Sequence, residues 1–166
     1  MALRHDYLSV VDDERSRALS RSVIDITELL FDIMKRGEFR LKIEPFCGTI
    51  YYFPSCHSRA LGNDVKMLEI LQLIPGAEVK KLEGGCCGAG GSYSFAKETF
   101  AMSMEMGDHL FGEVRSRDEV NSIVVTDGEE CALHIMQGTG VEADLPITLL
   151  SRLAGFSMVR IKRKRK

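Results

Sequence analysis

Apolar residues recur at helical spacing over residues 18–36, and this pattern predicts one amphipathic helix that ends before Gly37. The β-branched and aromatic run TIYYF at 49–53 predicts a strand that ends at Pro54. The segments AEVKKL at 77–82 and SIVVT at 122–126 predict two further strands. The chain therefore opens with a helix and continues with at least three strands.

Helices are predicted to fill the intervals between these strands and to follow the last one. The patterns place them at about 63–74, at 94–117, from Asp127–Glu130 to about Gln137, and in a short stretch starting near Pro146. Strands that alternate with helices predict an α/β fold, with a small, mainly parallel sheet flanked by helices. We expect a single domain over residues 1–155, with a helical lead-in, and a basic tail over 156–166.

The composition is that of an ordinary globular domain, with 45% hydrophobic and 28% charged residues in a chain of 166. No apolar run is long enough for a membrane-spanning helix, and the N-terminus lacks the apolar stretch of a signal peptide. We therefore expect a cytoplasmic protein. In that compartment, cysteine patterns indicate metal binding or catalysis rather than disulfides.

The charge is unevenly distributed. The net charge is −2, yet six of the last seven residues, 160–166, are Lys or Arg, so the preceding part is clearly acidic. Nucleic-acid-binding domains show a basic face within the fold, and we expect no nucleic-acid partner. We interpret the tail as a solvated, disordered end; contact with anionic lipid, and hence peripheral membrane association, is the alternative.

The most informative motif is Gly-Gly-Cys-Cys-Gly-Ala-Gly-Gly at 84–91, where two cysteines are adjacent. Neighbouring Cα atoms lie about 3.8 Å apart and disulfides usually need about 4.4–6.8 Å, so a Cys86–Cys87 bridge would be strained. Glycines allow a backbone to approach a metal closely. Two thiolates on such a loop therefore favour metal binding.

Four of the five cysteines follow predicted strands: Cys56 the first, Cys86 and Cys87 the second, and Cys131 the third. The carboxyl ends of parallel strands meet at one edge of a sheet, so we expect these thiols to converge there. Cys131 is also expected near a helix N-terminus, which favours thiolate. Cys47 precedes the first strand, should lie at the opposite end, and is left out of the site.

Four converging thiolates match the ligand set of a [4Fe–4S] cluster and also that of a structural zinc site. Soft sulfur ligands exclude Mg²⁺ and Ca²⁺. Structural zinc sites usually contain CxxC-type pairs, and none is present here, so the spacing favours iron–sulfur and leaves zinc as the alternative. A third interpretation, a phosphate-binding glycine loop, lacks both G-x-G-x-x-G and G-K-[ST] and leaves the thiol pair unexplained.

The motifs Ser55-Cys56-His57, Cys86-Cys87-Gly88 and Cys131 resemble those of the cysteine-rich CCG domain of iron–sulfur oxidoreductase subunits. The resemblance extends to Leu73-Ile74-Pro75-Gly76, Gly90-Gly91-Ser92-Tyr93, Val125-Thr126-Asp127 and Gln137-Gly138-Thr139-Gly140. That family includes the iron–sulfur subunits of anaerobic glycerol-3-phosphate dehydrogenase and glycolate oxidase, a lactate-utilisation protein, and one of the subunits of heterodisulfide reductase.

The resemblance implies an electron-transfer domain whose cluster is held by the four cysteines and relays electrons between a flavin dehydrogenase subunit and a quinone or other acceptor. It implies further domains as partners: a second CCG domain and a ferredoxin-like domain. Gly128 stands where heterodisulfide-reductase-type members have the first cysteine of a CxxC, which argues against five-thiolate clusters and thiol–disulfide chemistry. For the isolated domain prepared in air, we expect an empty site or Cys56, Cys86, Cys87 and Cys131 oxidised among themselves.

Residues beside the cysteines receive simpler interpretations. We expect His57 to orient its loop by a hydrogen bond, and His134 to be a core or surface residue rather than a ligand. Asp127 and Glu130 are expected to cap the following helix. Tyr93 and Phe95 are interpreted as packing around the loop. Met102, Met104 and Met106 are interpreted as core residues of the helix predicted over 94–117.

Overall fold

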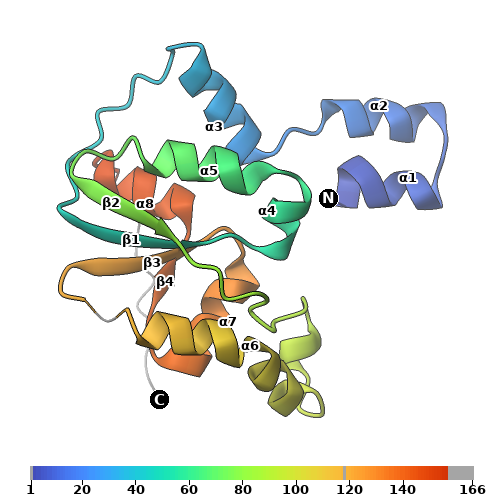
Figure 1. Ribbon diagram of the computed structural model, residues 1–166. Helices are drawn as coiled ribbons and strands as arrows, with labels where there is room; N and C mark the ends of the chain where they lie inside the picture. Colours follow the sequence, from blue (N-terminus) through green and yellow to red (C-terminus); the bar gives the residue numbers. More distant parts are fainter. Residues whose placement is uncertain (1, 118, 157–166) are drawn as a thin grey trace.

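The computed structural model describes residues 2–117 and 119–156, so the basic tail at 160–166 lies outside the described residues. Its centre is a four-stranded, all-parallel sheet in the order β2-β1-β3-β4 (Figure 1). The strands are β1 (Gly48–Phe53), β2 (Ala77–Lys81), β3 (Ser122–Thr126) and β4 (Ala143–Asp144). The predicted α/β fold is confirmed. The fourth strand was not predicted, because two residues are too few to form a sequence pattern.

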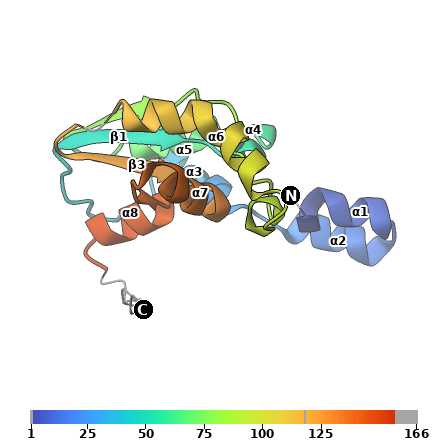
Figure 2. The ribbon, with the colours of Figure 1, turned by 90° about the horizontal axis from the view of Figure 1, so that it is seen from below.

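Helices cover both faces of the sheet (Figures 1 and 2). One face carries α6 (Phe100–Arg115) and α7 (Glu129–Thr139); the other carries α3 (Ile26–Lys35), α5 (Asn63–Leu71) and α8 (Pro146–Leu153). In β1, Tyr51 and Phe53 pack toward α6 and α7, whereas Ile50 and Tyr52 pack toward α5 and α8. Alternate side chains point to opposite faces of a strand, so a strand covered on both sides is apolar throughout.

The N-terminal segment forms an arm of three short elements: η1 (Ala2–Asp6), α1 (Tyr7–Val10) and α2 (Glu14–Ser22). The single helix predicted over 18–36 is wrong, because α2 ends at Ser22 and α3 starts at Ile26. The Asp25 side chain accepts a hydrogen bond from Thr27 N at 2.8 Å and caps α3, which ends the first helix and starts the second. An Arg4–Glu28 ion pair of 2.7 Å joins the arm to α3.

The helix predicted over 94–117 is shorter and is preceded by a 3₁₀ turn, η2 (Tyr93–Phe95). The expectation that its methionines fill the core is wrong for Met102 and Met106, which are 58% and 53% exposed; only Met104 packs against the core. Phe95 is largely exposed and Tyr93 is partly exposed, so neither side chain is buried by packing around the loop. The buried stripe of α6 is instead formed at helical spacing by Ser103, Gly107, Leu110, Phe111 and Val114.

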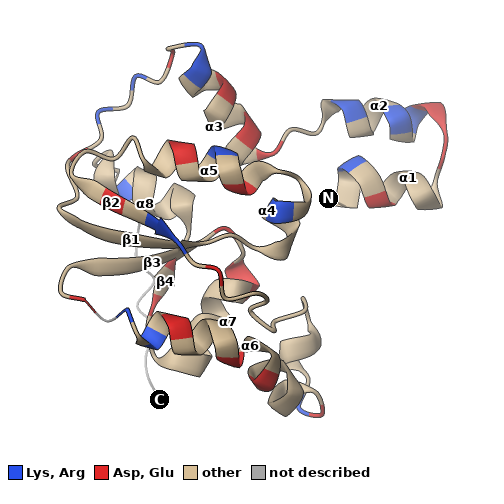
Figure 3. Cartoon of the chain, in the orientation of Figure 1, with Lys and Arg blue, Asp and Glu red and all other residues tan. Residues whose placement is uncertain are grey.

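Ion pairs tie α3 to α5 on the outer surface, and Figure 3 shows both acidic and basic positions along these two helices. Lys35 pairs with Glu69 at 2.7 Å, and Lys66 lies 3.7 Å from Glu28. Among the described residues, no helix has the length and apolar character needed to cross a membrane.

Candidate metal centre

The four candidate ligands all lie past the carboxyl ends of strands, as expected. Cys56 is the first residue of α4 (Cys56–Ala60), which follows β1, and Cys131 lies in the first turn of α7, which follows β3. Cys86 and Cys87 lie in the loop after β2, and this loop, α4 and the start of α7 meet at one end of the sheet (Figure 1). Cys47 directly precedes β1 and therefore lies at the opposite end.

Two of the thiols are in direct contact. Cys87 Sγ and Cys131 Sγ lie 2.9 Å apart, and both residues are buried. Cys56 and Cys86 are exposed beside them, and Cys86 Sγ accepts a hydrogen bond from Gly88 N at 3.3 Å. Within the described part of the chain, no three His, Cys, Asp or Glu side chains stand close enough to hold one metal ion. The structure thus joins two of the four thiols and places the other two nearby.

The contact between Cys87 and Cys131 shifts the pKa values of the two thiols in opposite directions. The hydrogen bond from Cys131, together with backbone N–H groups, lowers the pKa of Cys87 to about 7, although burial opposes this. The same hydrogen bond, burial and the nearby charges of Cys87, Cys56 and Asp127 raise the pKa of Cys131 far above its usual value. The pair therefore gives up one proton near neutral pH and holds the second, which a bound cation would have to displace.

The glycine loop lies directly on the backbone of α6. Gly88 has φ +81°, and a Cβ there would stand 2.1 Å from Ser103 O; a Cβ at Gly107 would stand 2.6 Å from Cys87 O. Both positions must be glycine for the loop and the helix to approach this closely. Gly107 thus contributes to the site from within a helix, and the sequence analysis did not find it, because an isolated helical glycine has no motif of its own.

His134 connects the cysteine loop to two helices. It is 1% exposed, its Nδ1 lies 2.6 Å from Cys87 O, and its Nε2 lies 3.3 Å from Ser103 Oγ. A carbonyl only accepts, so Nδ1 carries the hydrogen. The ring also meets Phe111 edge to face at 5.4 Å. With both ring nitrogens engaged, His134 positions the loop and is not a metal ligand, in agreement with the sequence interpretation.

Asp127 joins the ends of β1 and β3. Its Oδ1 accepts from Ser55 N at 2.7 Å and its Oδ2 accepts from Tyr52 Oη at 2.6 Å. The expectation that Asp127 and Glu130 cap α7 is therefore wrong: the N-cap is Gly128, and α7 has no side-chain cap. Asp127 instead holds the turn that precedes Cys56 against the strand that precedes Cys131.

Two neighbours of Cys56 complete the site. Arg59, in α4, donates from Nη1 to Gly85 O at 2.9 Å and lies over the Phe53 ring, which links Cys56's helix to the glycine loop. His57 is exposed, and no described residue forms a hydrogen bond with its side chain, so the expected orienting bond is not found. The sequence analysis missed Arg59, which stands in no motif.

The cysteines supply soft sulfur ligands at this edge. Asp127 and His134 are already engaged, whereas the four thiols are not committed to disulfides. The residues therefore fit a thiolate-bound group such as an iron–sulfur cluster or zinc, and do not fit Mg²⁺ or Ca²⁺.

An open parallel α/β sheet with free thiols gathered at its carboxyl edge defines a cysteine-rich α/β domain. The profile of one family, the CCG cysteine-rich domain, matches residues 50–136, just over half of the chain and all four candidate ligands. The chain belongs to the CCG cysteine-rich domain family.

Several curated proteins are similar to the chain. It is 32% identical over 151 residues to one of the subunits of anaerobic glycerol-3-phosphate dehydrogenase of Escherichia coli, covering 91% of the chain and 37% of the relative. It is 27% identical over 95 residues to lactate utilization protein A of Geobacillus, covering 55% and 39%. It is 34% identical over 117 residues to an uncharacterized iron–sulfur protein of Methanocaldococcus jannaschii, covering 68% and 22%.

The chain thus spans well under half the length of these relatives. No solved structure matches it significantly. The relatives support an oxidoreductase-related, iron–sulfur role within larger proteins or complexes.

Proposed function

We propose that Cys56, Cys86, Cys87 and Cys131 together bind a [4Fe–4S] cluster. The contact between Cys87 and Cys131 is the observation that carries this proposal, because it brings thiols 44 residues apart in the chain together at the sheet edge, next to the other two. Cys86 is exposed in the glycine loop, and Cys56 is the exposed first residue of a short helix, so a change in the orientation of these two side chains would complete the ligand set.

The domain would serve as an electron relay between a flavin dehydrogenase subunit, of the glycerol-3-phosphate, glycolate or lactate type, and a quinone or other acceptor. A bound cluster supplies one-electron chemistry at this edge. The protein's own contribution is to hold the four thiolates and exclude water around Cys87 and Cys131. Its partners would be further oxidoreductase subunits or domains: a second CCG domain and a ferredoxin-like domain. We place the protein in the cytoplasm, with peripheral membrane association through the complex.

Metal analysis of protein purified or reconstituted without oxygen tests the ligand assignment. We expect about four iron and four acid-labile sulfide per chain, as a [4Fe–4S] cluster requires. Replacing any one of the four cysteines by Ser should remove or convert the cluster, seen in the visible and electron paramagnetic resonance spectra. Cys47→Ser is the matched control, because Cys47 is exposed at the far end of the sheet. Stoichiometric zinc without sulfide would replace this proposal with a zinc-thiolate structural domain.

A second candidate, thiol–disulfide chemistry, is favoured by the contact between Cys87 and Cys131, which lowers the pKa of Cys87 to about 7. The pair would reduce a disulfide substrate while becoming a disulfide itself. If reduced, metal-free protein fails to reduce glutathione disulfide faster than its Cys131→Ser variant does, this candidate is wrong.

A further inference from the structure

Arg59 places a positive charge between the two segments that carry the exposed candidate ligands. It lies in α4, three residues after Cys56, and helix positions three apart share one face, with their Cβ atoms about 5–6 Å apart. Its Nη1 donates to Gly85 O at 2.9 Å, and Gly85 directly precedes Cys86 in the glycine loop. The guanidinium is therefore held close to the chain segments of both exposed thiols.

The Phe53 ring brings the same charge to the buried thiols. The guanidinium carbon of Arg59 lies 5.1 Å from the centroid of this ring. Phe53 is the last residue of β1, and it packs in the buried cluster that also contains Cys87 and Cys131. A single cation thus borders the segments that carry all four candidate ligands.

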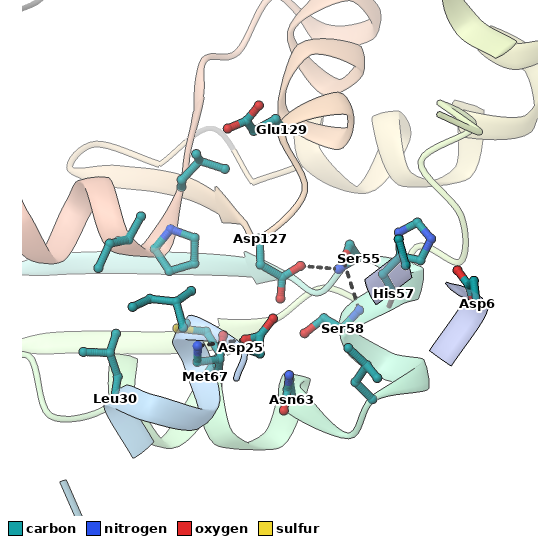
Figure 4. A pocket seen from close by; sticks show the side chains of 17 residues that line it. Asp6, Asp25, Leu30, Ser55, His57, Ser58, Asn63, Met67, Asp127 and Glu129 are labelled. Carbon is teal, nitrogen blue, oxygen red and sulfur yellow. Dashed lines mark hydrogen bonds between the residues drawn. The ribbon is translucent and has the colours of Figure 1, made fainter. Parts of the chain in front are cut away.

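This charge is buried and has no ionic partner within the described part of the chain. Its Nε and Nη2 atoms are closed off from solvent and form no hydrogen bond, and none of the ion pairs between described residues includes Arg59. Arg59 does not line the cavity beside α4, where several carboxylates gather (Figure 4): Asp6, Asp25, Asp127 and Glu129. A buried cation without a counter-charge is costly, so the fold leaves Arg59 in need of negative charge.

Thiolates at the sheet edge would supply that negative charge. A [4Fe–4S] cluster held by four cysteines is an anionic group, and its net charge is one of the factors that set its reduction potential. Solvent and salt screen a buried charge less than an exposed one, so Arg59 can act on such a group through space. Direct contact with Nε or Nη2 is not required, since the protein already encloses both atoms.

We propose that the positive charge of Arg59 raises the reduction potential of the cluster at this edge; the inference rests on the cluster assignment proposed above. Reduction adds one negative charge to the cluster, and a fixed positive charge nearby stabilises the reduced form more than the oxidised form. Arg59 would thus set the driving force for electron transfer without binding the metal. The bond from Nη1 to Gly85 O holds the charge in place while the cluster changes its oxidation state.

The test is a titration of the reconstituted chain with dithionite under exclusion of oxygen, with the reduced cluster followed by electron paramagnetic resonance. Arg59→Gln removes the charge and keeps an amide donor. We expect its midpoint potential to fall by at least the equivalent of a tenfold change in the equilibrium constant, which is about 59 mV for a one-electron couple. Arg59→Lys keeps the charge, so it should lower the midpoint by less than half as much.

A matched control removes an arginine that makes the same kind of bond elsewhere. Arg115 is exposed and donates to Gly138 O near the C-terminal ends of α6 and α7, whereas Cys131 lies in the first turn of α7. Arg115→Gln should therefore leave the midpoint unchanged. Circular dichroism of the metal-free forms checks that each variant is folded.

The outcomes separate this inference from the cluster assignment. A loaded Arg59→Gln variant with the midpoint of the original chain, or equal shifts in Arg59→Gln and Arg59→Lys, overturns the role of the charge and leaves the cluster assignment intact. If folded Arg59→Gln takes up no cluster but Arg59→Lys does, the charge is required and the inference is supported; failure of both variants overturns it. An original chain that binds neither iron nor sulfide overturns the cluster assignment, and this inference with it.

Discussion

Replacing His134 with Phe isolates the hydrogen bonds that hold the cysteine loop. Phe keeps a ring against Phe111 but removes the donor to Cys87 O and the contact with Ser103 Oγ. The main cost is that Cys87 O, within a buried residue, is left without its 2.6 Å partner, and an unpaired buried acceptor costs about 1–3 kcal/mol. For a domain of this size, that loss corresponds to a fall in thermal midpoint of about 3–8 °C.

Urea unfolding of the reduced, metal-free protein, followed by circular dichroism, measures this loss. We expect the midpoint to fall with the slope unchanged, which indicates a change in stability rather than in the denatured state. His134→Asn places an amide nitrogen near the position of Nδ1 and should recover part of the loss. The exposed His109→Phe is the control and should change stability by no more than about 0.5 kcal/mol. If His134→Phe is as stable as the original chain, the histidine does not secure the loop.

Three further predictions concern the same edge. Gly88→Ala should destabilise the fold by more than about 3 kcal/mol in urea unfolding, because its Cβ would meet the α6 backbone. The control Gly91→Ala, which has φ +63° and open space around it, should cost only about 1–2 kcal/mol. Equal costs for the two variants would show that the loop does not approach α6 this closely. Asp127→Asn should cost about 1.5–3 kcal/mol, since it replaces a carboxylate that accepts two short hydrogen bonds, and a smaller loss would mean that it does not join the strands. In the metal-free protein, ultraviolet thiolate absorbance should show one group titrating near pH 7, and Cys131→Ser should move that titration. The folded pKa of Cys87 lies below its unfolded value of about 9, so this group adds stability above pH 7 and loses that contribution as pH falls through 7; a single transition at pH 8.5–9 (about the value of an unperturbed thiol) would contradict the pairing.

Local patterns determined most of the fold. The runs TIYYF and SIVVT place apolar or aromatic residues on both faces of their strands because both faces are covered, and that property is visible without any contact being known. Strand order then placed four cysteines at one edge, since parallel strands share an end. The prediction of one helix over 18–36 was wrong because its apolar spacing continues through Asp25, whose side chain caps the start of α3 and so divides the segment into two helices.

By itself, then, the sequence determined the parallel α/β fold, the cysteine doublet among glycines and the exclusion of Cys47 from the edge. Only the tertiary structure decided which thiols touch, because the Cys87–Cys131 contact depends on how a loop and a helix from different strands pack. It also decided that Asp127 joins two strands instead of capping a helix. The residue type shows which hydrogen bonds a side chain can donate or accept. Its actual partner depends on how segments distant in sequence pack against each other.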